Sequence, residues 1–245
     1  MRQAMIFAAG LGTRLRPLTD TMPKALVKVG GEPLLGHVLH RLCDAGFGRV
    51  VINVHHFPDQ IIDFVGHQSF SGMEILISDE RDGLLETGGG LRKAASKFSD
   101  PDPVLIHNVD ILSNVDLDEC YTIAAPNDAT LLVSERKTNR YLLFDDDMRL
   151  VGWTNIATGE VRSPHKDINP QRCRHLAFAG IHVISQKLLE KMESWPDRFG
   201  IIDFYLDVCA ETNIIGYQKE DLRLMDVGKI NTLTEAEGFL NSLKK

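Results

Sequence analysis

Residues 4–24 read A-M-I-F-A-A-G-L-G-T-R-L-R-P-L-T-D-T-M-P-K. A short apolar run ends at Gly10 and Gly12, and two basic residues, Arg14 and Lys24, follow downstream. Glycine has no Cβ, so its backbone N–H groups can approach a polyphosphate closely. The arginine and the lysine would add positive charge beside that polyphosphate. The stretch therefore predicts a strand that ends in a phosphate-binding loop.

Spacing excludes two common phosphate loops. A Walker loop needs four residues between its glycines and then Gly-Lys-Ser/Thr, an order that this stretch lacks. The dinucleotide fingerprint G-x-G-x-x-G fails because Leu15 occupies its third glycine position. The predicted loop is a different phosphate-binding device.

Composition bounds the class of protein. At 245 residues, the chain is long enough to bury a substantial core as one large domain. A formal net charge of −7 argues against nucleic acid or an anionic membrane as a partner, so positive potential has to be local to the site. The four cysteines are scattered without a C-x-x-C pair, which favours a reduced, cytoplasmic protein without a zinc site.

The first part of the chain alternates short apolar runs with amphipathic stretches. Runs that are apolar on both faces, separated by helices, favour a mainly parallel sheet covered on both sides, an α/β fold. Such sheets bind ligands beyond the carboxyl ends of their strands. The predicted strands are 4–9, 49–54, 74–78, 104–108 and 130–134, and the predicted helices are 33–45, 59–65, 89–98 and 116–124.

The pattern changes from about Tyr141. A hairpin is predicted around the acidic turn 145–147, followed by a polar loop or lid over residues 155–174. The remaining predicted elements are strands at 176–184 and 223–227 and helices at 186–192, 203–210 and 232–243.

The run from Gly10 to Lys24, with Pro17, Thr19 and Pro23 in step, resembles the signature of the sugar-1-phosphate nucleotidyltransferases. The resemblance implies a single-domain, Rossmann-like sheet of the nucleotide-diphospho-sugar transferase type with a small antiparallel sugar-side extension. Residues 1–135 would be its nucleotide-binding half and 136–245 its sugar-binding half. The resemblance further implies catalytic roles for Arg14 and Lys24 and nucleotide contacts at Ala8, Ala9, Gly10, Gly12, Thr13 and Arg14.

Two aspartates are candidate Mg²⁺ ligands. Asp110 ends the apolar strand Leu105–Asn108, and the resemblance places the metal-binding aspartate there, although Val109 replaces the family's usual glycine. Asp226 lies in a string that resembles the family's W-x-D-[VI]-G, with Leu224 in the aromatic position. Two carboxylates, completed by phosphate oxygens and waters, suit Mg²⁺. Each aspartate could equally be a helix cap or a turn residue if it were seen alone.

The string Leu85–Gly90, L-E-T-G-G-G, looks most like the N-acetylmuramate-1-phosphate uridylyltransferases within this family. Three glycines are costly in a helix unless the backbone must lie close to something flat. The resemblance gives Glu86 and Gly88 as base-side contacts; the structural alternative is a loop with Thr87 as helix N-cap.

The sugar side is less well marked. The resemblance assigns Asn108 and Gly180 to sugar binding, but the family's E-K-P string is missing. Adjacent residues such as His55 and His56 point apart, so a metal pair there is not expected.

The expected reaction joins a nucleoside triphosphate to a sugar 1-phosphate and releases pyrophosphate. UTP with N-acetylmuramate 1-phosphate is the leading pair, and GTP with mannose 1-phosphate or another such pair is the alternative. A regulatory relative that binds a nucleotide sugar without turnover is the non-enzyme alternative. The chain is expected to act as a monomer or simple homodimer.

Overall fold

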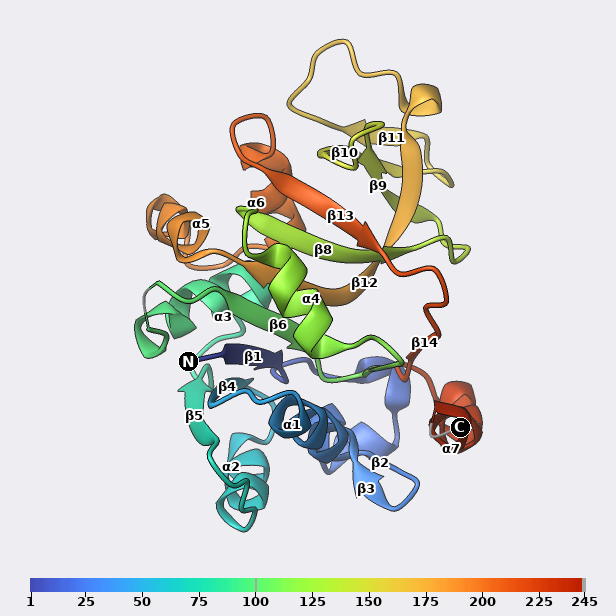
Figure 1. Cartoon of the computed structure of the whole chain (residues 1–245). Coiled ribbons are helices and arrows are strands. Elements are labelled where there is room, and N and C mark those ends of the chain that lie inside the picture. The colour runs from blue at the N-terminus through green and yellow to red at the C-terminus, as the bar shows by residue number, and fades with distance from the viewer. Residues whose placement is uncertain (100, 244–245) are drawn as a thin grey trace.

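The computed structural model describes residues 1–99 and 101–243 (Figure 1). Its centre is β1 (Gln3–Phe7), which pairs in parallel with β4 (Arg49–Val54) and β6 (Val104–Asn108). The strand β5 (Glu74–Asp79) extends this parallel block beyond β4. These strands are rich in β-branched and aliphatic residues, and β1, β4 and β6 are buried on both faces, as parallel strands covered by helices must be, whereas the edge strand β5 is only partly buried. The predicted parallel block is confirmed.

The second part of the chain continues the same sheet. The long strand β12 (Arg174–Ile184) runs antiparallel to β6 on one side and to β8 (Ala129–Ser134) on the other. Beyond β8 lies β13 (Ile214–Gln218), parallel to it and not predicted. The result is a ten-stranded mixed sheet.

A small antiparallel extension continues from the start of β12. It consists of β9 (Arg140–Phe144), β10 (Leu150–Asn155) and β11 (Glu160–Arg162), at the top of Figure 1. The prediction of an unbroken loop over residues 155–174 is wrong, because β11 pairs with β10 and a 3-10 turn forms at Pro170–Arg172.

Helices cover both faces of the sheet. Ala4 and Ile6 of β1 belong to one core with residues of α1 (Leu34–Asp44), α2 (Pro58–Gly66) and α4 (Leu117–Ala124). Met5 points to the other core, which is shared with α3 (Glu86–Ala94), α5 (Gln186–Glu190) and α6 (Ile201–Val208). This alternation follows from the two-residue period of a strand.

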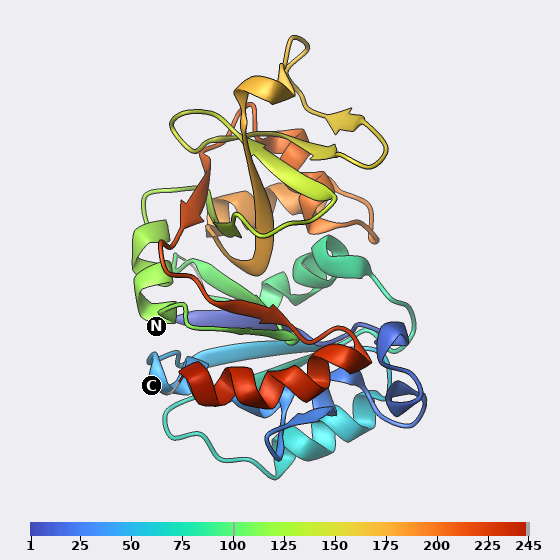
Figure 2. The ribbon, with the colours of Figure 1, turned by 90° about the vertical axis from the view of Figure 1, so that its right-hand side faces the viewer.

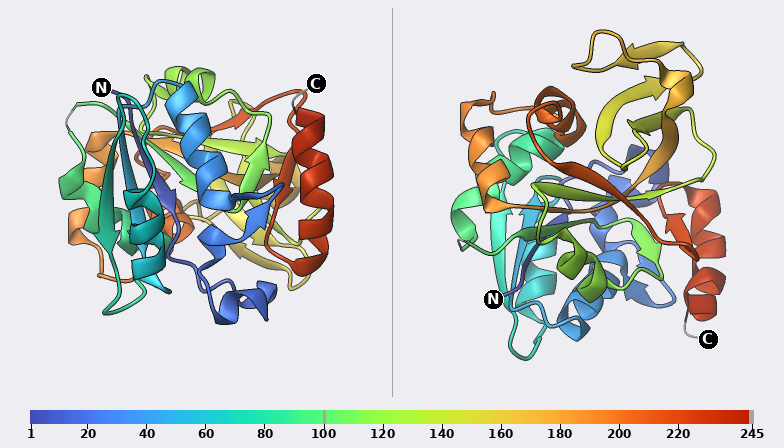
Figure 3. Two further views of the ribbon diagram at one scale, coloured as in Figure 1. Left: turned by 90° about the horizontal axis from the view of Figure 1, so that it is seen from below. Right: turned by 45° about the horizontal axis from the view of Figure 1, so that its top comes forward.

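The sequence did not predict two short strand pairs. β7 (Ile111–Ser113) pairs with β14 (Leu224–Asp226), and β2 (Lys28–Val29) pairs with β3 (Glu32–Pro33). The closing helix α7 (Ile230–Leu243) follows β14 and lies along the lower half of the molecule in Figure 2. In the left view of Figure 3, from below, α1 lies near the middle and α7 at the right edge, and both helices contribute residues to the same core.

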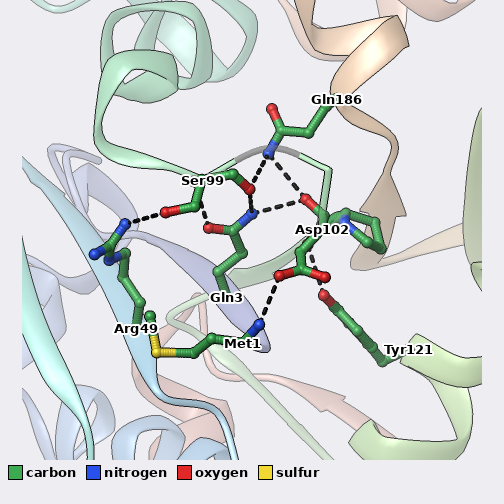
Figure 4. A network of polar contacts seen from close by, with 8 residues as sticks. Met1, Gln3, Arg49, Ser99, Asp102, Tyr121 and Gln186 are labelled. Atoms are coloured by element: carbon green, nitrogen blue, oxygen red, sulfur yellow. Dashed lines mark hydrogen bonds and ion pairs between the residues drawn. The ribbon is translucent and has the colours of Figure 1, made fainter.

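The amino ends of the strands are closed by a polar network (Figure 4). The amide of the buried Gln3 donates to the carbonyl oxygens of Ser99 and Asp102, 2.7 Å from each. Gln186 donates to the same Asp102 carbonyl, and the N-terminal ammonium of Met1 pairs with the Asp102 carboxylate at 2.6 Å. These groups pair with one another at the edge opposite the predicted phosphate loop.

None of the described helices is both long and apolar enough to span a bilayer.

Candidate active site

The two aspartates come together because two strands pair. Asp110 directly precedes β7, and the β7–β14 register places Asp226 opposite Ile111. The backbone N–H of Val227 donates to the carbonyl of Asp110 at 2.8 Å. Residues far apart in the sequence are thereby fixed at the carboxyl end of β6, beside the end of β1.

Lys24 reaches the same place from the loop after β1. It starts a single 3-10 turn, Lys24–Leu26, and its ammonium forms an ion pair and hydrogen bond with the Asp110 carboxylate. The two side chains are only 12% and 16% exposed, so water screens this pair weakly.

Asp226 carries an unsatisfied oxygen. Its Oδ1 is buried and has no hydrogen-bond partner among residues 1–99 and 101–243. Burial, and then the nearby Asp110 carboxylate, raises the pKa of Asp226, while Lys24, Arg14 and Arg136 oppose the increase. A buried carboxylate oxygen without a donor is costly unless a cation binds it. This pair of carboxylates therefore fits a divalent cation.

Arg14 faces the same pair. It lies in a 3-10 turn, Thr13–Leu15, which follows Gly12. A Cβ built on Gly228 would lie 2.6 Å from Asp226 Oδ1 and 2.7 Å from a terminal nitrogen of Arg14. The missing side chain of Gly228 thus leaves room for both the Arg14 guanidinium and the Asp226 carboxylate.

The loop leaves its backbone open where a ligand would come. Apart from Gly10 itself and its two chain neighbours, no heavy atom of the described residues lies within 4 Å of a Cβ built on Gly10. Gly12 has a φ of +62° and packs against Thr19 and Lys24, and the Thr19 hydroxyl donates to its carbonyl at 2.8 Å. Ala8 and Ala9 are buried at the strand end, whereas Thr13 is exposed.

A buried polar chain, which the sequence did not reveal, links this loop to α3. The N–H of Ala8 donates to Asn53 Oδ1, and Asn53 Nδ2 donates to Glu80 Oε1, each at 2.8 Å. The other Glu80 oxygen accepts from the N–H of Leu85 at 3.3 Å. Burial raises the pKa of Glu80, which is 1% exposed. Polar residues near the ends of the apolar strands β4 and β5 were the available signal.

The three glycines of α3 contact protein. A Cβ on Gly88 would overlap the Phe199 ring, one on Gly89 would overlap the Asp197 carbonyl oxygen, and one on Gly90 would crowd Glu80. The flat group beside Gly88 is therefore a side chain of this protein. The predicted base contact of Gly88 stays a prediction.

Glu86 and Thr87 hold the same segment. Glu86 has a φ of +62° and pairs with Arg198 at 2.9 Å. Thr87 does not cap its own helix; its hydroxyl oxygen accepts from the N–H of Ile201, the first residue of α6, at 2.9 Å. Thr87 therefore ties the start of α6 to the start of α3.

Asn108 and Gly180, the predicted sugar-side residues, lie side by side. Gly180 has a φ of +76°, and a Cβ there would be 2.8 Å from the Asn108 amide nitrogen. Gly180 stands where β12 bends between its two pairing registers.

The adjacent histidines His55 and His56 and the acidic turn at Asp145 make structural hydrogen bonds. His55 and His56 contact the carbonyl oxygens of Glu80 and Thr19, respectively. Asp145 accepts from two backbone N–H groups in its hairpin turn. Within the described part of the chain, no group of three or more His, Cys, Asp or Glu side chains is placed to hold a metal. A cation at Asp110 and Asp226 would need substrate or water oxygens as well.

Comparison with known proteins gives a family. Residues 3–142, more than half of the chain, match the family described as Nucleotidyl transferase. An N-acetylmuramate alpha-1-phosphate uridylyltransferase of Neisseria meningitidis serogroup B is 44% identical over 247 residues, covering 99% of this chain and all of that protein. A mannose-1-phosphate guanyltransferase of Kluyveromyces lactis is 33% identical, covering 99% of this chain and 66% of that protein.

Solved structures agree on the fold. The crystal structure of HddC from Yersinia pseudotuberculosis in complex with GMP-PN superposes with a TM-score of 0.76 at 21% identity. The match covers 98% of this chain and all of HddC. At that identity, the likeness concerns the arrangement of the elements.

Proposed function

The chain belongs to the nucleotidyl transferase family, and we propose that it transfers uridylyl from UTP to N-acetylmuramate 1-phosphate. The observation that carries the proposal is the convergence of Arg14, Lys24, Asp110 and Asp226 at one edge of the sheet. Full-length similarity to a protein of that named activity supports the substrate pair.

The reaction needs no general base. A phosphomonoester has a second pKa near ~6, so the sugar phosphate is already largely a dianion at neutral pH. One of its oxygens forms a bond to the α-phosphorus of UTP while the bond to the β-phosphate oxygen breaks. Pyrophosphate leaves with the electron pair of that bond. The enzyme has to position two polyanions and compensate their charge.

The basic residues have separate roles. Arg14, which follows the open backbone of Gly10 and Gly12, would hold the β- and γ-phosphates and then the leaving pyrophosphate. Lys24, which is held by Asp110, would lie between the α-phosphate and the incoming sugar phosphate. The Lys24 charge is held by Asp110 before the substrates arrive, so little reorganisation of that group is needed during the reaction.

We assign Mg²⁺ to Asp110 and Asp226, because Asp226 Oδ1 is buried without a partner in the described structure and the Asp110 carboxylate lies close enough to raise the pKa of Asp226. When bound, the ion would neutralise phosphate charge and hold both reactants in line. The carboxylates would supply two ligands, which suits an ion that usually keeps water and phosphate oxygens.

The remaining contacts follow the two halves. Ala8, Ala9, Thr13, Glu86 and Gly88 would contact the nucleotide from residues 1–135. Asn108, at the end of the first half, and Gly180, in the second half, touch each other and would both contact the sugar. We further propose a cytoplasmic monomer or simple homodimer, in keeping with the net charge of −7.

The test is a pyrophosphate-release screen of four nucleoside triphosphates against a panel of sugar 1-phosphates, with and without Mg²⁺. We expect the highest kcat/KM for UTP with N-acetylmuramate 1-phosphate and little release without Mg²⁺. Turnover that is indifferent to Mg²⁺, or no turnover with any pair, would refute the proposal.

The second candidate pair is GTP with mannose 1-phosphate, because the guanyltransferase of K. lactis aligns over nearly the whole chain. A higher kcat/KM for that pair in the same screen would select it. A regulatory binder would instead retain a nucleotide sugar without releasing pyrophosphate.

A further inference from the structure

A cavity of about 360 Å³ opens in the antiparallel extension, on the sugar side of the sheet. It lies between the segment after β8, the strands β9 to β11 and the start of α6. Its lining residues include three arginines, one aspartate and two aromatic residues, namely Arg136, Arg140, Arg162, Asp203, Trp153 and Phe178. Its volume suits a sugar-sized ligand.

The lining carries an excess of positive charge. Asp203 pairs with Arg162 at 2.8 Å and accounts for one of the three guanidinium groups. Arg136 donates to the carbonyl of Phe178 at 3.2 Å, and neither it nor Arg140 has a carboxylate partner in the described structure. Two guanidinium groups are thus available to an anion, and a guanidinium fork matches a carboxylate geometrically.

The cavity lies toward the same edge of the sheet as the reaction site. β8 runs antiparallel to β12, and β12 runs antiparallel to β6, so the segments after β8 and β6 leave the sheet at the same edge. Arg136 follows β8 and is close enough to Asp226 to lower its pKa. Phe178 lies two residues before Gly180, which touches Asn108. A ligand in the cavity can therefore extend toward the acid pair.

The walls are suited to a ring. Trp153 and Phe178 are only partly exposed and offer flat apolar surface, and the Arg162 guanidinium lies 5.8 Å from the Trp153 ring centre. Stacking on Trp153 fixes Arg162 in the wall, in addition to its pairing with Asp203.

We propose that this cavity is the subsite that selects an acidic sugar, with Arg140 and Arg136 binding the carboxylate of a sugar-acid 1-phosphate whose phosphate faces Lys24. The inference rests on the proposed function and extends it to particular residues. It explains how the chain can separate an acidic from a neutral sugar although the family's E-K-P string is missing.

The experiment compares two sugar 1-phosphates that differ by the lactyl carboxylate, N-acetylmuramate 1-phosphate and N-acetylglucosamine 1-phosphate, each with UTP. We expect Arg140→Met to lower kcat/KM for the acidic substrate about 10- to 100-fold, the effect of one lost hydrogen bond to a charged group. The value for the neutral substrate should stay within about twofold. Arg172→Met, an exposed arginine outside this cavity, is the matched control and should change neither value.

An equal loss on both substrates, or an unchanged preference in Arg140→Met, would overturn the inference. If the wild type turns over sugar 1-phosphates but does not prefer the acidic one, the inference fails while the proposed function stands. If the wild type turns over no pair, the proposed function fails. Calorimetry with free N-acetylmuramate then decides: binding that weakens about tenfold in Arg140→Met supports the subsite, and no binding to the wild type refutes it.

Discussion

Two glycine-rich segments, residues 10–12 and 88–90, look alike in the sequence and differ in the structure. Around Gly10 there is open space within the described structure, and the loop continues to two cations that face the acid pair. Gly88, Gly89 and Gly90 are all buried and lie against other parts of the chain. Glycine therefore allows the protein to pack closely against itself in the second segment, whereas in the first it leaves space for the proposed phosphates.

We therefore expect substitutions in the two glycine-rich segments to affect different properties, turnover for the first and stability for the second. Substitutions in or after the first segment should reduce turnover and spare the fold. Substitutions in the second should destabilise the fold, because α3 is held by the segment Trp195–Gly200 and by Glu80. The predictions below test that division in order of expected size.

The largest effect is expected for Lys24→Ala and Asp110→Asn, which break the ion pair at the reaction site. Each should lower kcat by about 10²–10³, or about 3–4 kcal/mol, because a preorganised charge is lost. Circular dichroism and the thermal midpoint should show a folded protein. Near-wild-type turnover in either variant would contradict the assigned roles.

Gly89→Ala should lower the free energy of unfolding by about 1–3 kcal/mol, since its Cβ overlaps the backbone carbonyl of Asp197, which cannot simply rotate away. Urea unfolding measures this change. The matched variant Gly10→Ala should keep its stability within about 0.5 kcal/mol and raise the KM for the nucleoside triphosphate. The comparison breaks if Gly10→Ala is the less stable of the two.

Glu80→Gln should change how stability depends on pH. The folded-state pKa of Glu80 is raised, so between the unfolded value and the folded value the folded state binds more protons, and stability falls as pH rises. One such group can contribute at most about 1.4 kcal/mol per pH unit. The variant should lose less stability than the wild type between pH 5 and pH 7 in urea titrations. If the stability of the two proteins changes with pH in the same way, burial does not raise the pKa of Glu80.

The smallest effect is expected for Thr87→Val, which removes the acceptor of the Ile201 N–H at the start of α6. The loss of a helix cap costs about 1 kcal/mol, and urea unfolding should show it. An unchanged midpoint would mean that the segment Trp195–Gly200 holds α6 without Thr87.

The sequence predicted the parts of the molecule that local patterns define. The apolar runs of β1, β4, β5 and β6 predicted those strands within two residues, because β1, β4 and β6 are buried on both faces and β5 still carries three consecutive aliphatic residues. The sequence did not predict the short strands β7, β11 and β13, because these strands depend on pairing with distant segments more than on their own residues.

The candidate site divides in the same way. Its individual residues could be identified from motifs, but the contact of Arg14 with Gly228 could not, since it depends on how β14 returns to β7. Nor could the cluster of Arg136, Arg140 and Arg162, which the stretch from the end of β8 to the start of β9 and the strand β11 bring together. The roles of these residues stay predictions.

The buried chain of hydrogen bonds from Ala8 through Asn53 and Glu80 to Leu85 connects the end of β1, where we propose that the phosphates bind, to the helix α3 that we propose for the base. Both middle residues, Asn53 and Glu80, are buried, and under the proposed function they would define the length of nucleotide that fits. Replacing the first turn of α3 by that of a relative with another base preference should therefore misalign the proposed phosphate-binding and base-binding regions. Replacing Asn53 and Glu80 together with that turn should restore their alignment.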